Sequence, residues 1–207
     1  DIVSEARMAG HLDWDAIEDR GRVPDVPRQW GSAREILDVA MRQFRLPRWE
    51  DQATYVELWV EKQALAGVLE PLAHRHHITL MVNKGYSSQS AMRESAIRFS
   101  HAEERGKDVV LGYLGDHDPS GEDMVRDIRD RLALFGVESL QVDKLALNMD
   151  QVRRYKLPPN PAKSSDSRFK KYQEEFGDES WEVDALNPKT LQQIVTDWVL
   201  DYVDREK

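Results

Sequence analysis

Two aspartates separated by one residue lie in the segment LGYLGDHDPSGEDM (residues 111–124). Asp116 and Asp118 follow an apolar stretch typical of a buried strand, and the residues PSG lead from them into a helical pattern. Two carboxylates this close repel each other, and a cation between them relieves the repulsion. Magnesium takes oxygen ligands from one or two carboxylates and completes its shell with water and phosphate. The pattern therefore predicts a site for a hard divalent cation, Mg²⁺ or Mn²⁺.

A third carboxylate has the same relation to another predicted strand. Glu61 stands at the carboxyl end of VELWVEK (residues 56–62), and Lys62 follows it as a candidate phosphate contact. Ligands of an open parallel sheet bind outside the carboxyl ends of its strands, so we expect Glu61 to meet Asp116 there. An isolated D-x-D is also typical of a turn with Ser120 as the helix cap, but the matching Glu-Lys at a second strand end favours a site.

The elements that must position these residues alternate between strand and helix. The predicted strands, rich in β-branched and aromatic residues, are 54–60, 77–83, 108–114 and 137–142. The predicted helices are 62–75, 87–105 and 120–135. This alternation favours parallel pairing through right-handed crossovers. The expected fold class is α/β, with an open parallel four-stranded sheet flanked by helices and with helical N- and C-terminal extensions.

The flanking segments differ from this pattern. Ser32 is the expected N-cap of a helix that runs to Phe44, residues 157–167 are too rich in Pro and Ser for regular structure, and an apolar stripe from Leu191 to Tyr202 predicts a final helix. The predicted parts are a lead-in of helical and extended structure (1–48), an α/β domain (49–150), and a loop and helical C-terminal extension that packs on it (151–207).

The composition is that of a soluble globular protein. Of the 207 residues, 40% are hydrophobic and 32% are charged, and no apolar run is long enough to span a bilayer. The absence of cysteine excludes disulfides and thiolate metal sites and fits the cytoplasm. The net charge of −9 excludes a broadly basic nucleic-acid-binding surface. A polyanion would be bound through a local basic patch and metal ions.

The order of these motifs resembles a known family. A glutamate in VEK after the first strand, followed by GDHDPSG after a later strand, is similar to the Toprim domain. It is most similar to the A subunit of type VI DNA topoisomerases and to the Spo-eleven-like double-strand-break proteins. The likeness covers residues 54–143 and extends more weakly to 144–205, where WEVDAL (181–186) is similar to an acidic, apolar motif. It implies Mg²⁺-dependent phosphoryl transfer on DNA, in a topoisomerase-like DNA cleavage domain. The implied metal-binding and catalytic residues are Glu61, Asp116 and Asp118.

One part of that family's machinery is not found in this sequence. Type VI topoisomerases attack DNA with a tyrosine on a winged-helix domain that precedes the Toprim domain. No tyrosine precedes Tyr55, which lies in a predicted strand, although residues 1–20 are candidates for the tail of such a domain. Two mechanisms stay open. The nucleophile is a tyrosine further upstream, in which case the isolated chain is inactive, or it is water and the enzyme is a nuclease.

Other residues are weaker candidates. Asp123, Glu182 and Asp184 are expected to contact the metal ligands, although Asp123 also suits a helix N-terminus and the other two also suit a cap or the surface. His117, between the two aspartates, either joins the site or points away. The candidate phosphate- or DNA-binding residues are Lys62, Lys84, Ser87, Ser88, Arg153, Arg154, Lys170 and Lys171. An ordinary turn and a solvated loop are the alternatives for these stretches.

Three classes of function remain at this point. The first is a Mg²⁺-dependent enzyme acting on DNA, either topoisomerase-like or a nuclease. The second is a non-catalytic module that binds nucleic acid or assembles with a partner, and the complete carboxylate trio argues against it. The third is a phosphohydrolase or phospho-acceptor domain, which the glutamate-first order disfavours. The resemblance implies DNA, a homodimer and an ATPase subunit as partners, and no membrane.

Overall fold

The computed structural model describes residues 2–13, 26–83 and 88–204 and divides the chain into two compact units, Asp1–Leu46 and Pro47–Lys207. The first unit contains α1 (Ile2–Met8) and α2 (Ala33–Gln43). The Ser32 side chain accepts a hydrogen bond from the Glu35 amide at 3.3 Å, so the predicted N-cap of α2 is confirmed. In the described part of the chain, no helix is both long and apolar enough to cross a membrane.

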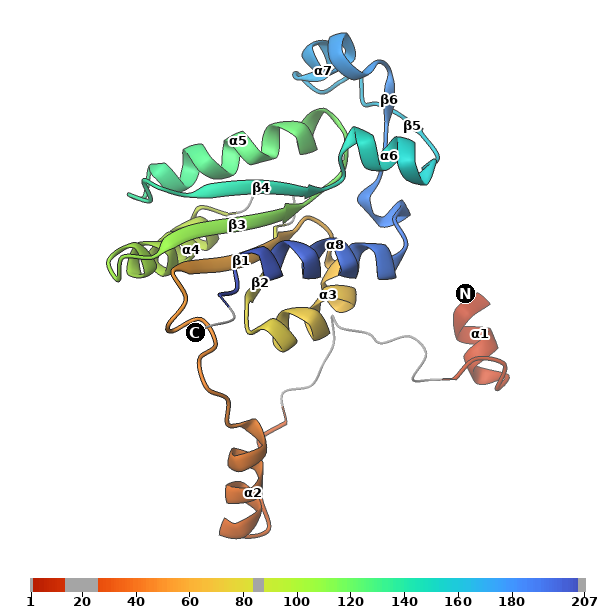
Figure 1. The fold of residues 1–207 in the computed structure, drawn as a ribbon. Helices are drawn as coiled ribbons and strands as arrows, with labels where there is room; N and C mark the ends of the chain where they lie inside the picture. The colour runs from red at the N-terminus through yellow and green to blue at the C-terminus, as the bar shows by residue number, and fades with distance from the viewer. Residues whose placement is uncertain (1, 14–25, 84–87, 205–207) are drawn as a thin grey trace. The chain divides into compact units, whose positions relative to one another are not determined.

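The second unit is built on four parallel strands (Figure 1). They are β1 (Thr54–Val60), β2 (Thr79–Val82), β3 (Asp108–Leu114) and β4 (Gln141–Ala146), in the order β2-β1-β3-β4. Val60 pairs with Val82 on one side and with Leu114 on the other, and Leu114 pairs with Ala146. The carboxyl ends of all four strands therefore lie along one edge. The predicted fold class, an open parallel four-stranded α/β sheet flanked by helices with helical ends, is confirmed.

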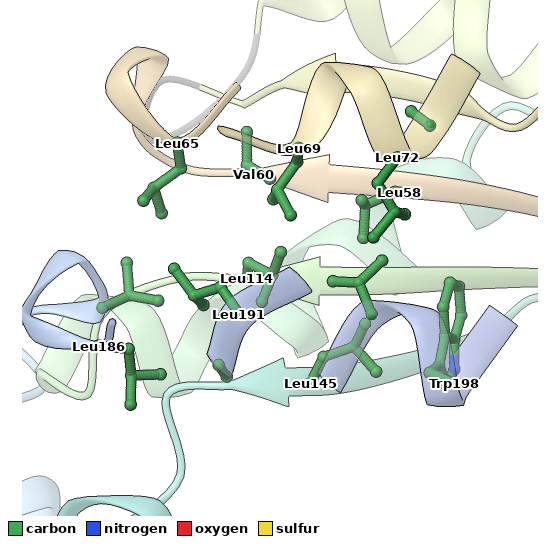
Figure 2. Close-up of a cluster of buried hydrophobic side chains, with 14 of the residues drawn as sticks. Leu58, Val60, Leu65, Leu69, Leu72, Leu114, Leu145, Leu186, Leu191 and Trp198 are labelled. Atoms are coloured by element: carbon green, nitrogen blue, oxygen red, sulfur yellow. The ribbon is translucent and has the colours of Figure 1, made fainter. Parts of the chain in front are cut away.

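Two pairs of helices cover the two faces of the sheet. They are α3 (Gln63–His76) and α8 (Pro188–Asp201) on one face, and α4 (Gln89–Glu103) and α5 (Pro119–Ala133) on the other. Successive side chains of a strand point to opposite faces, so Leu58 packs with α3 and α8 while Trp59 packs with α4 and α5. Figure 2 shows the first of these clusters.

A glycine in β3 lets α8 approach the sheet closely. A Cβ at Gly112 would lie 2.7 Å from the Trp198 ring and 2.8 Å from the Leu145 side chain. Any larger residue would push the last helix away from the sheet, because cores are packed without room for another carbon. Trp198 also donates through Nε1 to Asp143 at 2.8 Å, which fixes α8 against β4.

The fourth strand begins later than the sequence indicated. The sequence predicts a strand over residues 137–142, whereas β4 is Gln141–Ala146. The hydrophobic pattern disfavoured the charged pair Asp143 and Lys144, yet both have partners. Asp143 accepts from Trp198 and from the Tyr202 hydroxyl, and Lys144 donates to the Asp116 carbonyl at 3.1 Å. Charged residues are tolerated in a strand when such partners are available.

The segment after β4 crosses the carboxyl edge of the sheet. It contains α6 (Met149–Tyr155), β5 (Asn160–Pro161), α7 (Phe169–Phe176), β6 (Glu179–Ser180) and a 3-10 turn, η2 (Val183–Ala185). The stretch 157–167, predicted to be irregular, is a loop apart from the two residues of β5, which pair with β6. The segment thus connects the sheet to α8.

Candidate functional site

Glu61 and Asp116 meet at the carboxyl edge of the sheet. Glu61 follows β1 directly, and its amide donates to the Leu114 carbonyl at the end of β3 at 2.9 Å. Its Oε2 accepts a hydrogen bond from the Asp116 amide at 3.0 Å. Both residues are half-buried. Two residues 55 positions apart (116 − 61) are therefore held in contact by the pairing of their strands.

The Asp116 carboxylate lies in a partly dry and negatively charged environment. Burial raises its pKa to about 6, and the charge of Glu61 raises it as well. Two contacts oppose these effects: Oδ1 accepts from the Val183 amide at 2.8 Å and lies 3.1 Å from Lys62 Nζ. A carboxylate that is costly to ionise in the free protein is a natural position for a bound cation.

Asp118 has a defined structural role as the N-cap of α5. Its Oδ1 accepts from the Gly121 amide at 2.6 Å and from the Ser120 hydroxyl at 2.9 Å. The N-cap of α5 is therefore Asp118, whereas the turn interpretation of the sequence assigns this role to Ser120. A Cβ at Gly121 would lie 2.1 Å from the Asp116 carbonyl oxygen. Only glycine allows the first turn of α5 to fold back over the Asp116 backbone.

Lys62 lies among three carboxylates. Its Nζ is 3.1 Å from Asp116 Oδ1 and 3.1 Å from Asp184 Oδ1, and it also donates to Glu182. Burial alone would lower the pKa of Lys62, but these carboxylates raise it above its ordinary value. The structure thus brings Glu182 and Asp184 to the site, where they are linked to Asp116 through the Lys62 ammonium.

His117 points into an aromatic cluster, with its Nε2 3.5 Å from Glu122 Oε1. Its Nδ1 is 2.9 Å from the Tyr172 hydroxyl, and its ring packs edge-on against Phe176 at 4.6 Å between centroids. Its backbone exchanges two hydrogen bonds with Trp181, at 2.8 and 2.9 Å. Burial lowers the pKa of His117, which favours the neutral ring. These contacts fasten the C-terminal segment to the D-x-D loop and so bring the Val183 amide to Asp116.

The oxygens of the three carboxylates suit a hard cation. One oxygen of each accepts from a backbone amide, and among the described residues no hydrogen-bond donor contacts the other oxygen of Glu61, Asp116 or Asp118. No group of three or more His, Cys, Asp or Glu side chains within residues 2–13, 26–83 and 88–204 is close enough together to hold a metal. Glu61 and Asp116, joined through the Asp116 amide, are two carboxylates of the kind that Mg²⁺ takes when water and phosphate complete its shell.

The other predicted residues are spread more widely. Asp123 is paired with Arg126 at 2.7 Å and with Arg168 at 3.3 Å. Ser88 is the N-cap of α4 and accepts from the Ala91 amide at 3.2 Å. Lys84 and Ser87 lie outside the described residues. The other four candidate DNA-binding residues are all exposed: Arg153 and Arg154 on α6, and Lys170 and Lys171 on α7.

Of these four candidate DNA-binding residues, Lys171 alone lines a cavity beside the site. This cavity of about 240 Å³ lies between α5 and α7 and includes Pro119, Glu122 and Arg168 in its wall. Pro119 directly follows the N-cap Asp118. None of Arg153, Arg154 and Lys170 lines this cavity.

Sequence reasoning missed three residues that shape the site. The Tyr113 hydroxyl lies 3.4 Å from Glu61 Oε2, and burial raises its pKa well above the ordinary value. Lys144 links the Asp116 carbonyl to Glu122. The Val183 amide holds Asp116 Oδ1. The only sequence signal for Lys144 is the charged pair that it forms with Asp143 beside apolar residues of β4, and a backbone amide carries no sequence signal.

We compared the chain with protein-family models, with curated proteins and with solved structures, and none of them matched.

Proposed function

We propose that this protein is a Toprim-like domain that supports Mg²⁺- or Mn²⁺-dependent phosphoryl transfer on DNA. The observation that carries the proposal is the contact between Glu61 Oε2 and the Asp116 amide at the carboxyl edge of a parallel sheet. This is the edge at which open α/β sheets bind ligands. The order of the motifs in the sequence, VEK and then GDHDPSG, adds the resemblance to the type VI topoisomerase A subunit.

In this proposal Glu61, Asp116 and Asp118 would hold the cation. The cation, when bound, neutralises charge on the phosphate oxygens and polarises the phosphorus. The backbone amides that hold one oxygen of each carboxylate fix the direction of the other. Glu182 and Asp184 orient Lys62, whose ammonium would face a phosphate oxygen of the DNA backbone.

The nucleophile is not a tyrosine of the described residues near this site. Tyr113 is fully buried, and burial together with the charge of Glu61 raises its pKa. Tyr172 is buried and its hydroxyl binds the His117 and Glu179 carbonyls. We therefore assign the attack either to a tyrosine of a longer protein, as in the topoisomerase-like mechanism, or to water, as in a nuclease.

The resemblance extends the proposal to the setting of the protein. A homodimer, an ATPase partner subunit and a cytoplasmic location follow from the likeness to the type VI topoisomerases. Size-exclusion chromatography with light scattering tests the dimer.

The test combines DNA binding with DNA cleavage. The wild-type chain, Glu61→Gln and Asp116→Asn are incubated with supercoiled plasmid and with a short labelled duplex, in Mg²⁺ and in EDTA. Asp150→Asn is the matched control, because the Asp150 side chain is 98% exposed. We expect Mg²⁺-dependent DNA binding in the wild type and the control, and its loss in both site variants. Nicking with free DNA ends identifies the nuclease, whereas binding without nicking identifies the need for an external tyrosine.

The proposal fails if DNA binding and cleavage by the wild type are the same in Mg²⁺ and in EDTA, and are unchanged by both site substitutions. Binding that survives chelation would instead support the alternative of a non-catalytic nucleic-acid-binding or assembly module.

A further inference from the structure

A second cavity lies at the opposite end of the sheet from the carboxylates. It has a volume of about 310 Å³ and is formed by residues 47–50, the beginning of β1 and the C-terminal ends of α3 and α4. Tyr55 in its wall pairs with Val109 at the amino end of β3, five positions before Leu114 closes the strand. This cavity, which we call the basic cavity, is therefore separate from the site of Glu61 and Asp116.

The wall of the basic cavity is strongly positive, although the chain as a whole carries a net charge of −9. Its only carboxylate among the described lining residues is Glu50, which is exposed. Its cationic side chains are Arg48, Arg98, Arg105 and Lys107, and His77 and His101 also contribute to the wall. Positive side chains gathered in a concave surface attract anions more strongly than the same charges on a convex one.

These charges differ in how far they are neutralised. Arg98 is fully engaged by the buried Glu57, with Nε 2.6 Å from Oε1 and Nη2 3.0 Å from Oε2. Lys107 donates to the carbonyls of Glu50 and Gln52 at 2.7 Å and to that of Trp49. These carbonyls satisfy its hydrogen bonds but leave its charge without a counter-ion.

Two arginines complete the positive wall. Arg48 uses Nη1 to bind the Arg75 carbonyl at 3.0 Å. Among the described residues no carboxylate forms an ion pair with Arg48, Arg105 or Lys107. The carbonyl ends of helices favour both arginines, since Arg48 contacts the last turn of α3 and Arg105 follows the C-cap of α4, but the Arg105 side chain is exposed.

Two aromatic side chains of the wall are held rigidly. Trp49 donates through Nε1 to the His76 carbonyl at 2.8 Å, and the Tyr55 hydroxyl donates to Glu57 at 2.8 Å. Both rings are half-buried. A cavity of about 310 Å³ is at the lower end of the range for small-ligand sites. Fixed rings beside unpaired cations are the surfaces that bind a base and its phosphate.

We propose that the basic cavity binds a nucleoside 5′-monophosphate group, with Arg48 and Arg105 facing the phosphate, the charge of Lys107 beside them, and Trp49 and Tyr55 facing the base. The group belongs either to a free nucleotide or to the 5′-phosphorylated end of a nucleic-acid strand. The proposal does not depend on metal binding at the other end of the sheet.

Calorimetric titration in EDTA, which removes any contribution of metal ions, tests this site in the complete chain. The probes are AMP, adenosine, inorganic phosphate, and a short oligonucleotide with and without a 5′-phosphate. We expect AMP to bind and adenosine to bind at least tenfold more weakly. A 5′-phosphorylated oligonucleotide that binds more tightly than AMP identifies a strand end as the ligand, whereas the reverse order identifies a free nucleotide.

The variant Arg105→Glu should weaken AMP binding at least tenfold without unfolding the chain, because Arg105 is exposed and forms no side-chain hydrogen bond or ion pair with the residues that the structure describes. The matched control is Arg129→Glu on the exposed side of α5, which should bind as the wild type does. Equal affinity of Arg105→Glu and wild type for AMP, or no binding of AMP and of the phosphorylated oligonucleotide to the wild type, would overturn the proposal.

Discussion

Replacing Asp116 by asparagine should stabilise the metal-free protein. Burial and the charge of Glu61 raise the pKa of Asp116 from 3.8 to about 6, in spite of the contacts with Val183 and Lys62. The rise is about 2, and one pKa unit corresponds to about 1.4 kcal/mol. Ionisation of Asp116 thus costs the folded state about 3 kcal/mol at neutral pH. Asparagine keeps the shape of the side chain without the charge.

The effect should depend on pH in a defined direction. Because the folded-state pKa lies above the unfolded-state pKa, the folded protein holds the proton more tightly between pH 3.8 and about 6. The contribution of Asp116 to stability therefore falls as pH rises through this window. The advantage of Asp116→Asn should be absent at about pH 4 and complete at about pH 8.

Urea unfolding followed by circular dichroism, in EDTA at both pH values, measures this difference. Asp150→Asn, at a side chain that is 98% exposed, should match the wild type at both pH values. The reasoning is refuted if Asp116→Asn is less stable than the wild type at the higher pH, or if its advantage is the same at both.

Three further substitutions probe the surroundings of the site. Gly121→Ala places a Cβ 2.1 Å from the Asp116 carbonyl oxygen and should lower the free energy of unfolding in urea by about 1–3 kcal/mol. An unfolding curve identical to that of the wild type would contradict this close approach. Arg98→Leu leaves the fully buried Glu57 without its counter-ion and should cost about 3–5 kcal/mol. Also changing Glu57 to Leu should not restore the wild-type stability, because Trp59 Nε1 and the Tyr55 hydroxyl then lose their acceptor. A loss below about 1 kcal/mol for Arg98→Leu would contradict the pairing. Lys62→Met removes the ammonium beside Asp116 and should tighten Mg²⁺ binding about tenfold in calorimetry. Weaker Mg²⁺ binding would contradict the idea that Lys62 competes with the cation for Asp116.

The strands that carry the site could be predicted from local sequence. The predicted ranges 54–60 and 108–114 are identical to β1 and β3. Both strands are rich in Val, Leu and aromatic residues and are bounded by clear turn signals, so local preference and burial agree. The contact of Glu61 with Asp116 then follows from parallel pairing, which places strand ends at one edge.

The environment of the site could not be predicted in the same way, because it depends on long-range contacts. Lys62 is paired with Glu182 and Asp184, which lie 120 and 122 positions away, while its predicted contact with a phosphate stays a prediction. The aromatic contacts of His117 that align the C-terminal segment likewise join residues far apart in the sequence. No periodicity encodes such pairs.

The cap of α5 and the start of β4 could not be predicted for a different reason. A serine and an aspartate in one turn can each cap a helix, and only the backbone path decides in favour of Asp118. The fourth strand was placed too early because a charged pair in a strand is unfavourable until a partner is known. Trp198 and Tyr202, the partners of Asp143, come from the last helix.

The most direct measurement is a titration of Mn²⁺ into the protein, followed by electron paramagnetic resonance of the free ion. Wild type and Asp150→Asn should remove Mn²⁺ from solution, and Mg²⁺ should displace it. Glu61→Gln and Asp116→Asn should each abolish this binding, since both carboxylates face the same cation. Unchanged Mn²⁺ binding in both variants, or none in the wild type, would contradict a shared cation at this edge of the sheet.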